Sequence, residues 1–319
     1  MNTLVLLAGI VLASSPEPRA TVIVVVGAEG APEFGRQFKT WAERWQEAAR
    51  RGAADIAILG LDKPGAKDDR SLLQERLAAS AGTSTGPLWL ILIGHGTYDG
   101  KTPRFNLRGP DVSAAELAQW LKPVDRPLAI INCASGSAPF LNELSGPNRV
   151  VITATRSGHE TSFSRFGDYL SSAIADPRAD LDKDEQVSLL EAYLLAAAGV
   201  REFYAGEGRL ASEHPLIDDN GDRLGTPPDW FKGTRAVKTA KSGARPDGVR
   251  AGQWHLIPGP RELQLAAQAR ERRDQLEQEL GDLRDRKAQL AEDEYFALLE
   301  PLLVELSQLY ETSAPAESK

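Results

Sequence analysis

Two side chains that could act together as a nucleophile and a base stand just beyond two apolar runs of the sequence. His95 follows the run at residues 88–93, and Cys133 follows the run at residues 128–132. Cys133 is the only cysteine in the chain, so it has no partner for an internal disulfide. Each run predicts a buried strand, and open α/β sheets place their sites at the carboxyl ends of parallel strands. The sequence therefore predicts a Cys–His dyad in which the imidazole takes the proton of the thiol during attack.

Small residues surround both side chains. Gly96 comes directly after His95, and without a Cβ it would let a substrate carbonyl approach the main chain closely. Residues 134–137 after Cys133 are Ala, Ser, Gly and Ser, so backbone N–H groups there could face an oxyanion. A packing role for Cys133 is the alternative, because a lone cysteine at the end of an apolar strand often serves as a small buried hydrophobe.

These motifs, His-Gly after one strand and Cys-x-Ser-Gly-Ser after the next, resemble those of the legumain-like branch of the caspase–haemoglobinase cysteine peptidases. The resemblance runs over residues 22–175, about half of the chain. It implies a cysteine endopeptidase that acts on protein or peptide substrates through a thioester acyl-enzyme and requires no cofactor for catalysis. The implied roles fall on His95 as general base or acid, on Cys133 as nucleophile, and on the backbone N–H groups of Gly96 and Cys133 as oxyanion donors.

The resemblance extends to a specificity pocket. The family places an arginine early in the first helix, a Glu-Ser-Ser element after the strand that follows the cysteine, and a Gly-Asp pair further on. Arg36, Ser162 and Asp168 stand at the matching positions, which implies a pocket for an asparagine or aspartate side chain. The chain departs from the family at Ile131, where the family has an acidic residue, and in a shorter loop before Gly167.

Two other functions remain open on the residues alone. One is a catalytically inactive peptidase fold that serves as a binding or scaffold module. The other is a thiol transamidase, which would use the same dyad to pass the acyl group to an amine.

Apolar strands and amphipathic helices alternate along residues 20–225. This order predicts one α/β domain with a mostly parallel sheet and helices on both faces, and the resemblance implies a caspase–haemoglobinase-like topology for it. The helix expected at residues 33–51 carries an aromatic stripe that we expect in the core. Strands are expected at residues 21–26, 56–60, 88–93, 128–132 and 150–155, and further helices at residues 70–81, from 113 onward, at 140–144 and at 163–174.

The acidic segment at residues 180–191 matches a twelve-residue calcium loop, in which oxygen ligands at fixed positions wrap a hard cation. Glu185 departs from the pattern, because it replaces the glycine of the sharp turn. A capping box formed by Ser188 and Glu191 explains the same segment without a metal. A second oxygen-rich turn at residues 218–222 could be another cation site or an Asn-Gly turn, and the turn is favoured. The candidate ligands are Asp180, Asp182, Asp184, the carbonyl of Gln186, Ser188 and Glu191.

Charge and hydropathy limit the partners and the location. The formal net charge is −8, so the chain lacks the excess of lysine and arginine that is typical of proteins that bind nucleic acid. Residues 4–12 are apolar and small residues follow them, so residues 1–15 are expected to be a signal peptide and the protein to be secreted or periplasmic. The run is shorter than the roughly 20 residues that a membrane span needs.

The C-terminal third predicts a separate helical segment. Residues 226–259 show little periodicity and are expected to form an irregular connection. Leucines at helical spacing within residues 260–310 predict a helical hairpin or a short coiled coil. Such a segment could fold onto the catalytic domain, pair with a partner protein or self-associate. Residues 311–319 are expected to be a disordered tail.

Overall fold

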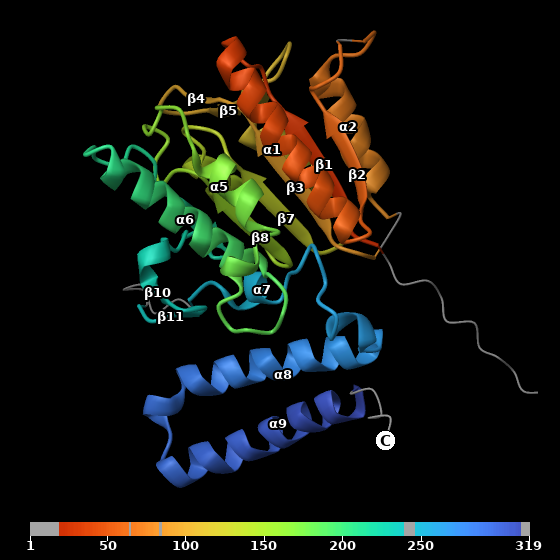
Figure 1. Ribbon diagram of the computed structural model, residues 1–319, viewed down its shortest axis with the longest axis vertical. Coiled ribbons are helices and arrows are strands. Elements are labelled where there is room, and N and C mark those ends of the chain that lie inside the picture. The colour runs from red at the N-terminus through yellow and green to blue at the C-terminus, as the bar shows by residue number, and fades with distance from the viewer. Residues whose placement is uncertain (1–18, 64, 83–84, 239–245, 314–319) are drawn as a thin grey trace, which may run out of the picture.

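The computed structural model describes residues 19–63, 65–82, 85–238 and 246–313 of the chain. Its centre is a six-stranded sheet in the order β2-β1-β3-β7-β8-β9 (Figure 1). Neighbouring strands run parallel except β8 and β9, which are antiparallel. The strands are β1 (Thr21–Val26), β2 (Asp55–Leu59), β3 (Leu88–Ile93), β7 (Leu128–Asn132), β8 (Arg149–Thr153) and β9 (Leu216–Asp218).

Continuous apolar runs form the middle of the sheet because both of its faces are covered. Every residue of β3 and β7 is buried, as expected of parallel strands between two helical layers. Helices α1, α5 and α6 pack on one face, and α2, α3 and α4 pack on the other. The predicted α/β fold is confirmed. The helices are α1 (Pro32–Arg51), α2 (Asp69–Ser80), α3 (Ala114–Trp120), α4 (Ala138–Leu144), α5 (Phe166–Ala173) and α6 (Leu189–Gly206).

Local signals set where these helices begin. At α3 the Ser113 hydroxyl accepts the N–H of Glu116, and the Glu116 carboxylate accepts the N–H of Ser113, which completes a capping box. Helix α5 begins three residues later than the sequence predicts. The reason is the carboxylate of Glu213, which accepts the N–H groups of Arg165 and Phe166 and so caps the helix at this point.

Short strands that periodicity could not reveal complete the domain. Strands β4 (Gly96–Tyr98), β5 (Pro103–Phe105) and β6 (Val112–Ser113) form an antiparallel sheet directly after His95. The connection expected to be irregular contains β10 (Phe231–Lys232), β11 (Arg235–Ala236) and α7 (Val249–Gly252). Runs of two to four residues are too short to show an apolar period.

The C-terminal helical segment consists of α8 (Ala267–Asp285) and α9 (Glu292–Ser313), which lie side by side beneath the sheet (Figure 1). Helix α9 continues three residues into the tail that the sequence predicts to be disordered. The predicted signal peptide and residues 314–319 lie outside the described residues. No helix among the described residues has the length and apolar character that a bilayer crossing requires.

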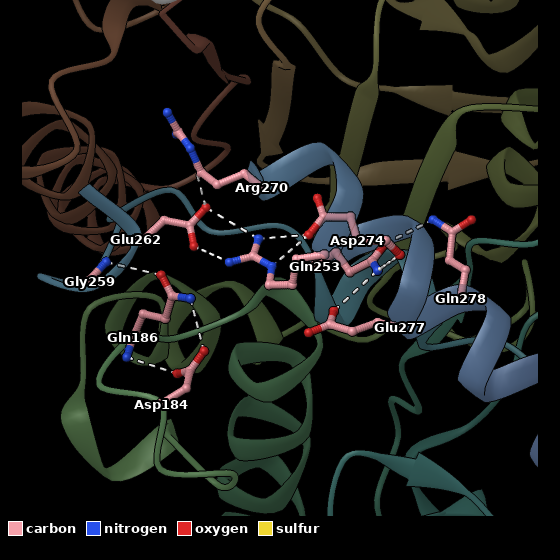
Figure 2. Close-up of polar contacts among 10 residues, drawn as sticks. Asp184, Gln186, Gln253, Gly259, Glu262, Arg270, Asp274, Glu277 and Gln278 are labelled. Atoms are coloured by element: carbon pink, nitrogen blue, oxygen red, sulfur yellow. Dashed lines mark hydrogen bonds and ion pairs between the residues drawn. The ribbon is translucent and has the colours of Figure 1, made fainter. Parts of the chain in front are cut away.

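Polar contacts join α8 to the domain above it (Figure 2). The Gln253 amide donates to the backbone carbonyl of Asp274 at 2.7 Å and to the carboxylate of Glu277 at 3.3 Å. Gln278 in turn donates to Gln253 at 3.0 Å. The apolar side of α8 faces α9, so the hairpin meets the domain through amides and charges.

A buried carboxylate pair, Asp219 and Asp247, ties the turn at residues 218–222 to α7. Asp247 Oδ1 accepts the N–H of Asp219 at 2.9 Å, and Asp219 Oδ2 accepts the N–H of Ala251 at 2.8 Å. Burial, and secondly the charge of Asp219, raises the pKa of Asp247 to about 8. This network and the left-handed Gly221, at φ +82°, account for the acidic turn as a structural element.

The Asp247 carboxyl gives a pH-dependent stability. Its pKa is raised in the folded chain, so the folded state holds a proton that the unfolded chain loses above pH ~4, and stability falls as the pH rises towards 8. Asp247→Asn keeps the Oδ1 acceptor but cannot titrate. The slope of the free energy of unfolding against pH should therefore become less steep, by up to about 1.4 kcal/mol per pH unit. Urea unfolding at pH 5, 6, 7 and 8 measures this. Asp125→Asn at an exposed site is the control, and an unaltered slope in Asp247→Asn contradicts the prediction.

Candidate active site

Strands β3 and β7 deliver His95 and Cys133 to the same edge of the sheet. The two strands are neighbours, with Leu92 opposite Asn132, so Cys133 begins the chain beyond β7 and His95 lies just beyond β3. His95 is partly exposed, whereas Cys133 is 1% exposed. The structure therefore brings the two predicted residues to adjacent strand ends, with the thiol closed off from solvent.

Aromatic rings and one carbonyl hold the imidazole of His95. The ring meets Phe34 and Phe38 edge-on, with centroids 5.0 Å and 5.2 Å away, and Phe163 at 6.0 Å. Its Nε2 lies 3.2 Å from the backbone carbonyl oxygen of Glu29. Because a carbonyl only accepts, this contact assigns the proton to Nε2 and leaves Nδ1 as the basic nitrogen of the neutral ring.

The Cys133 side chain packs against α1 and α5. A Cβ built on Gly167 would lie 2.9 Å from Cys133 Cβ and 2.7 Å from Trp41 Cζ3, so this glycine allows close packing around the sulfur. Burial raises the pKa of Cys133 to about 12, and the charge of Glu213 adds to the shift. Within the described residues no hydrogen bond joins the ring of His95 to the sulfur. The raised pKa favours the protonated thiol at neutral pH.

Backbone N–H groups near the sulfur differ in availability. The N–H of Cys133 donates to the Leu92 carbonyl at 2.9 Å, so it does not have the role of oxyanion donor that the sequence predicts. The N–H of Gly136 donates to the Glu160 carbonyl at 2.8 Å. The N–H of Gly96 makes only a long contact, 3.4 Å, with the hydroxyl of Ser135. Gly96 therefore carries the more accessible donor of the predicted pair.

The residues predicted to line the specificity pocket come from two parts of the fold, α1 and the segment that leads into α5. Arg36 is exposed on α1, and Ser162 is exposed in the segment before α5. Asp168, in the first turn of α5, accepts from Arg44 Nη1 at 2.6 Å. Among the described residues no hydrogen bond or ion pair joins Arg36, Ser162 and Asp168 to one another. Arg44, two turns beyond Arg36 on α1, is a partner that the motif comparison missed.

The buried carboxylate of Glu213 and the partly buried carboxylate of Glu160 anchor the segment at residues 156–166, which we call the site strap. Glu213 is 1% exposed and accepts the hydroxyl of Ser164 at 2.7 Å in addition to its contacts at the start of α5. Glu160 pairs with His214 Nδ1 at 2.6 Å and accepts the N–H of Arg156 at 3.0 Å. These anchors keep Phe163 of the strap against the ring of His95. Sequence analysis missed both partners, Glu213 and His214, because they lie about fifty residues further along the chain.

The acidic loop at residues 180–191 brings three carboxylates together, but both carboxylate oxygens of Glu191 already accept protein hydrogen bonds, Oε1 from the N–H of Leu181 at 2.7 Å and Oε2 from the N–H of Ser188 at 2.8 Å. Carboxylate oxygens of Asp180, Asp182 and Asp184 lie within 4.8 Å of one another. Glu185 adopts the left-handed conformation, φ +72°, at the position where the calcium pattern has glycine. Ser188 and Glu191 also form the predicted capping box of α6.

Side chains of this loop also reach the chain beyond α7. Gln186 donates to Asp184 at 2.9 Å and accepts the N–H of Gly259 at 3.0 Å (Figure 2). Burial, with the charges of Asp184, Glu191 and Asp180, raises the pKa of Asp182 to about 6.

Comparisons with known proteins add little to this geometry. No family model matches the chain, and no curated protein matches it. Among solved structures, the crystal structure of the Drosophila initiator caspase Dronc is similar over 64% of this chain and 81% of that chain, with a TM-score of 0.45 and 14% sequence identity. The fold is therefore assigned from the sheet order and the helical layers described above. The legumain-like resemblance stays a prediction from the motifs.

Proposed function

We propose that this chain is a cysteine endopeptidase that cleaves peptide bonds through His95 and Cys133. The observation that carries the proposal is the delivery of one imidazole and the sole thiol to the ends of adjacent parallel strands, β3 and β7. The carbonyl of Glu29 supports it, because a proton fixed on Nε2 leaves Nδ1 to accept the thiol proton.

The reaction would proceed in two steps. Nδ1 of His95 takes the proton of Cys133 as the sulfur attacks the scissile carbonyl, and the Gly96 N–H faces the developing oxyanion. The carbon–nitrogen bond then breaks, the amine leaves with the proton from His95, and a thioester remains. Water activated by the same imidazole hydrolyses the thioester and restores the thiol. For the side chain before the scissile bond we propose asparagine or aspartate, on the strength of the motif that contains Arg36, Ser162 and Asp168.

Substrate access requires a rearrangement around Cys133, because its side chain is 1% exposed and packs against Trp41 of α1 and Gly167 of α5. A peptide bound along the strand ends would drive this rearrangement and expose the sulfur. A small alkylating reagent lacks the contacts needed to do so. The proposal therefore predicts a large difference between two kinds of thiol reagent.

The test compares a peptidyl acyloxymethyl ketone with iodoacetamide on the native chain. The peptidyl probe should label Cys133, while iodoacetamide reacts slowly at pH 8, since a thiol with a pKa of about 12 is almost fully protonated there. Intact-mass and peptide mapping identify the labelled residue. Labelling by neither reagent until the chain is denatured would exclude the peptidase.

That negative outcome would support the second candidate function, a catalytically inactive peptidase fold that binds other proteins. The observation in its favour is the packing of Cys133 among Trp41 and Gly167, which is the environment of a structural cysteine. The same two reagents thus separate the two functions.

We further propose that residues 180–191 bind calcium. Three convergent carboxylates and a left-handed residue at loop position six support this assignment. Asp182→Asn should weaken calcium binding about tenfold or more, because one charged ligand is lost from the set. Isothermal titration calorimetry of the full chain measures the effect.

The control for calcium is Asp222→Asn in the second acidic turn, whose side chain makes only a turn contact with the N–H of Leu224. This variant should bind calcium like the unaltered chain. No heat beyond dilution at millimolar calcium would leave the capping box of Ser188 and Glu191 as the whole explanation of the loop.

A further inference from the structure

Helix α9 has more apolar surface than α8 covers. Tyr295 and Leu306 face α8 and are buried or half-buried. Phe296, Leu303 and Tyr310 remain 51%, 44% and 45% exposed. These three residues are spaced by seven, so they form one stripe along the helix, beside the side that contacts α8. We call them the α9 stripe.

The spacing distinguishes this stripe from ordinary surface residues. Single exposed apolar side chains are common and need no explanation. A helix in a two-helix hairpin needs an apolar face only wide enough for its one neighbour. A second apolar seam at heptad spacing is the pattern of a helix that contacts two neighbours. The α9 stripe therefore has the pattern of a surface on which a third helix packs.

The charges around the stripe indicate the kind of helix that fits. Helix α9 contains no lysine or arginine. Glu292, Asp293 and Glu300 lie three or four residues from Phe296 or Leu303, so they border the stripe. A second copy of α9 would place acidic residues against acidic residues, which disfavours self-association. The acidic residues of the helix are Glu292, Asp293, Glu294, Glu300, Glu305 and Glu311.

We propose that the α9 stripe docks an amphipathic helix of a partner protein, with apolar residues at the a and d heptad positions and lysine or arginine at the flanking positions. Its apolar seam would cover Phe296, Leu303 and Tyr310, and its cations would pair with Glu300 and the acidic first turn of α9. The hairpin and the docked helix would then form a three-helix bundle. This interaction is independent of the peptidase proposal, whereas Tyr310 at one end of the stripe lines the same cavity as Asp182 and Asp184 of the acidic loop.

The test uses a fluorescent synthetic peptide of about three heptads with leucine at a and d and lysine at the flanking positions. It should bind the full chain one to one in fluorescence anisotropy, more weakly as salt is raised. The double variant Phe296→Ser/Leu303→Ser should weaken binding about tenfold or more, because two central apolar contacts are lost. Glu300→Gln should weaken it and reduce its salt dependence.

Leu298→Ser is the matched control, since Leu298 is 43% exposed on the same helix but lies on the opposite flank from Phe296. It should bind the peptide like the unaltered chain. Equal binding of a peptide with glutamate in place of lysine, equal loss in Leu298→Ser, or no binding at all would each overturn the proposal. Sedimentation that shows a dimer dissolved by the double variant would overturn it in favour of a second copy.

Discussion

Replacing His95 by alanine is expected to slow the cleavage of a peptide substrate by about a thousandfold or more, because the thiol then has no base for its proton. The effect should be large here because burial holds the pKa of Cys133 near 12, which leaves almost no thiolate to react unaided. Cys133→Ala should abolish cleavage. Fluorogenic peptides with asparagine or aspartate before the scissile bond provide the measurement.

His159→Ala is the matched control for this prediction. His159 belongs to the site strap and stacks edge-on against Tyr98 with centroids 5.4 Å apart, on the same side of the domain as the dyad. Its removal should leave the rate close to that of the unaltered chain. A rate in His95→Ala comparable to that in His159→Ala would exclude His95 as the base. Addition of a competing amine distinguishes peptide hydrolysis from transamidation, because a transamidase would form the amide product.

Gly167→Ala is expected to destabilise the fold by about 1 to 3 kcal/mol, the usual range for an overpacked core. The added Cβ would lie 2.7 Å from Trp41 Cζ3 and 2.9 Å from Cys133 Cβ, and both of these residues are only 1% exposed in the close-packed core. Denaturant unfolding measures the loss of stability. Reaction of Cys133 with iodoacetamide should accelerate in the same variant, because strain at this contact loosens the cover of the sulfur.

Gly206→Ala provides the comparison for this change. Gly206 is the last residue of α6, whereas Gly167 lies in the first turn of α5, and a Cβ on Gly206 meets nothing within 4 Å. Its replacement should be neutral or stabilise the chain by up to about 1 kcal/mol, since alanine favours the helix. Similar stabilities of the two variants would show that the packing around Cys133 is looser than the structure indicates.

Local patterns predicted the framework of the domain because they depend on neighbouring residues. The apolar runs of β3 and β7 and the capping box at Ser113 are each contained in a few consecutive residues. The adjacency of His95 and Cys133 followed from the position of each residue just beyond its strand. The fold class and the strand ends that carry the dyad could thus be derived from the sequence.

The surroundings of the dyad could not be derived, because distant segments supply them. Glu29 contacts His95 through its backbone carbonyl. Every residue has this group, so the residue type at position 29 does not predict the contact. Arg44 and Asp168 are 124 residues apart, and their pairing follows from the packing of α1 on α5. The burial of Cys133 likewise depends on Trp41 and Gly167, which are distant in the sequence. The residues next to the cysteine therefore did not predict it.

The burial of Cys133 also affects how readily its sulfur is oxidised. Peroxides react with the deprotonated sulfur, and conversion to sulfinic or sulfonic acid is irreversible in most proteins. A sulfur that is 1% exposed with a pKa of about 12 offers almost no thiolate to such oxidants. The packing of Cys133 against Trp41 and Gly167 thereby keeps the sulfur in its reduced form.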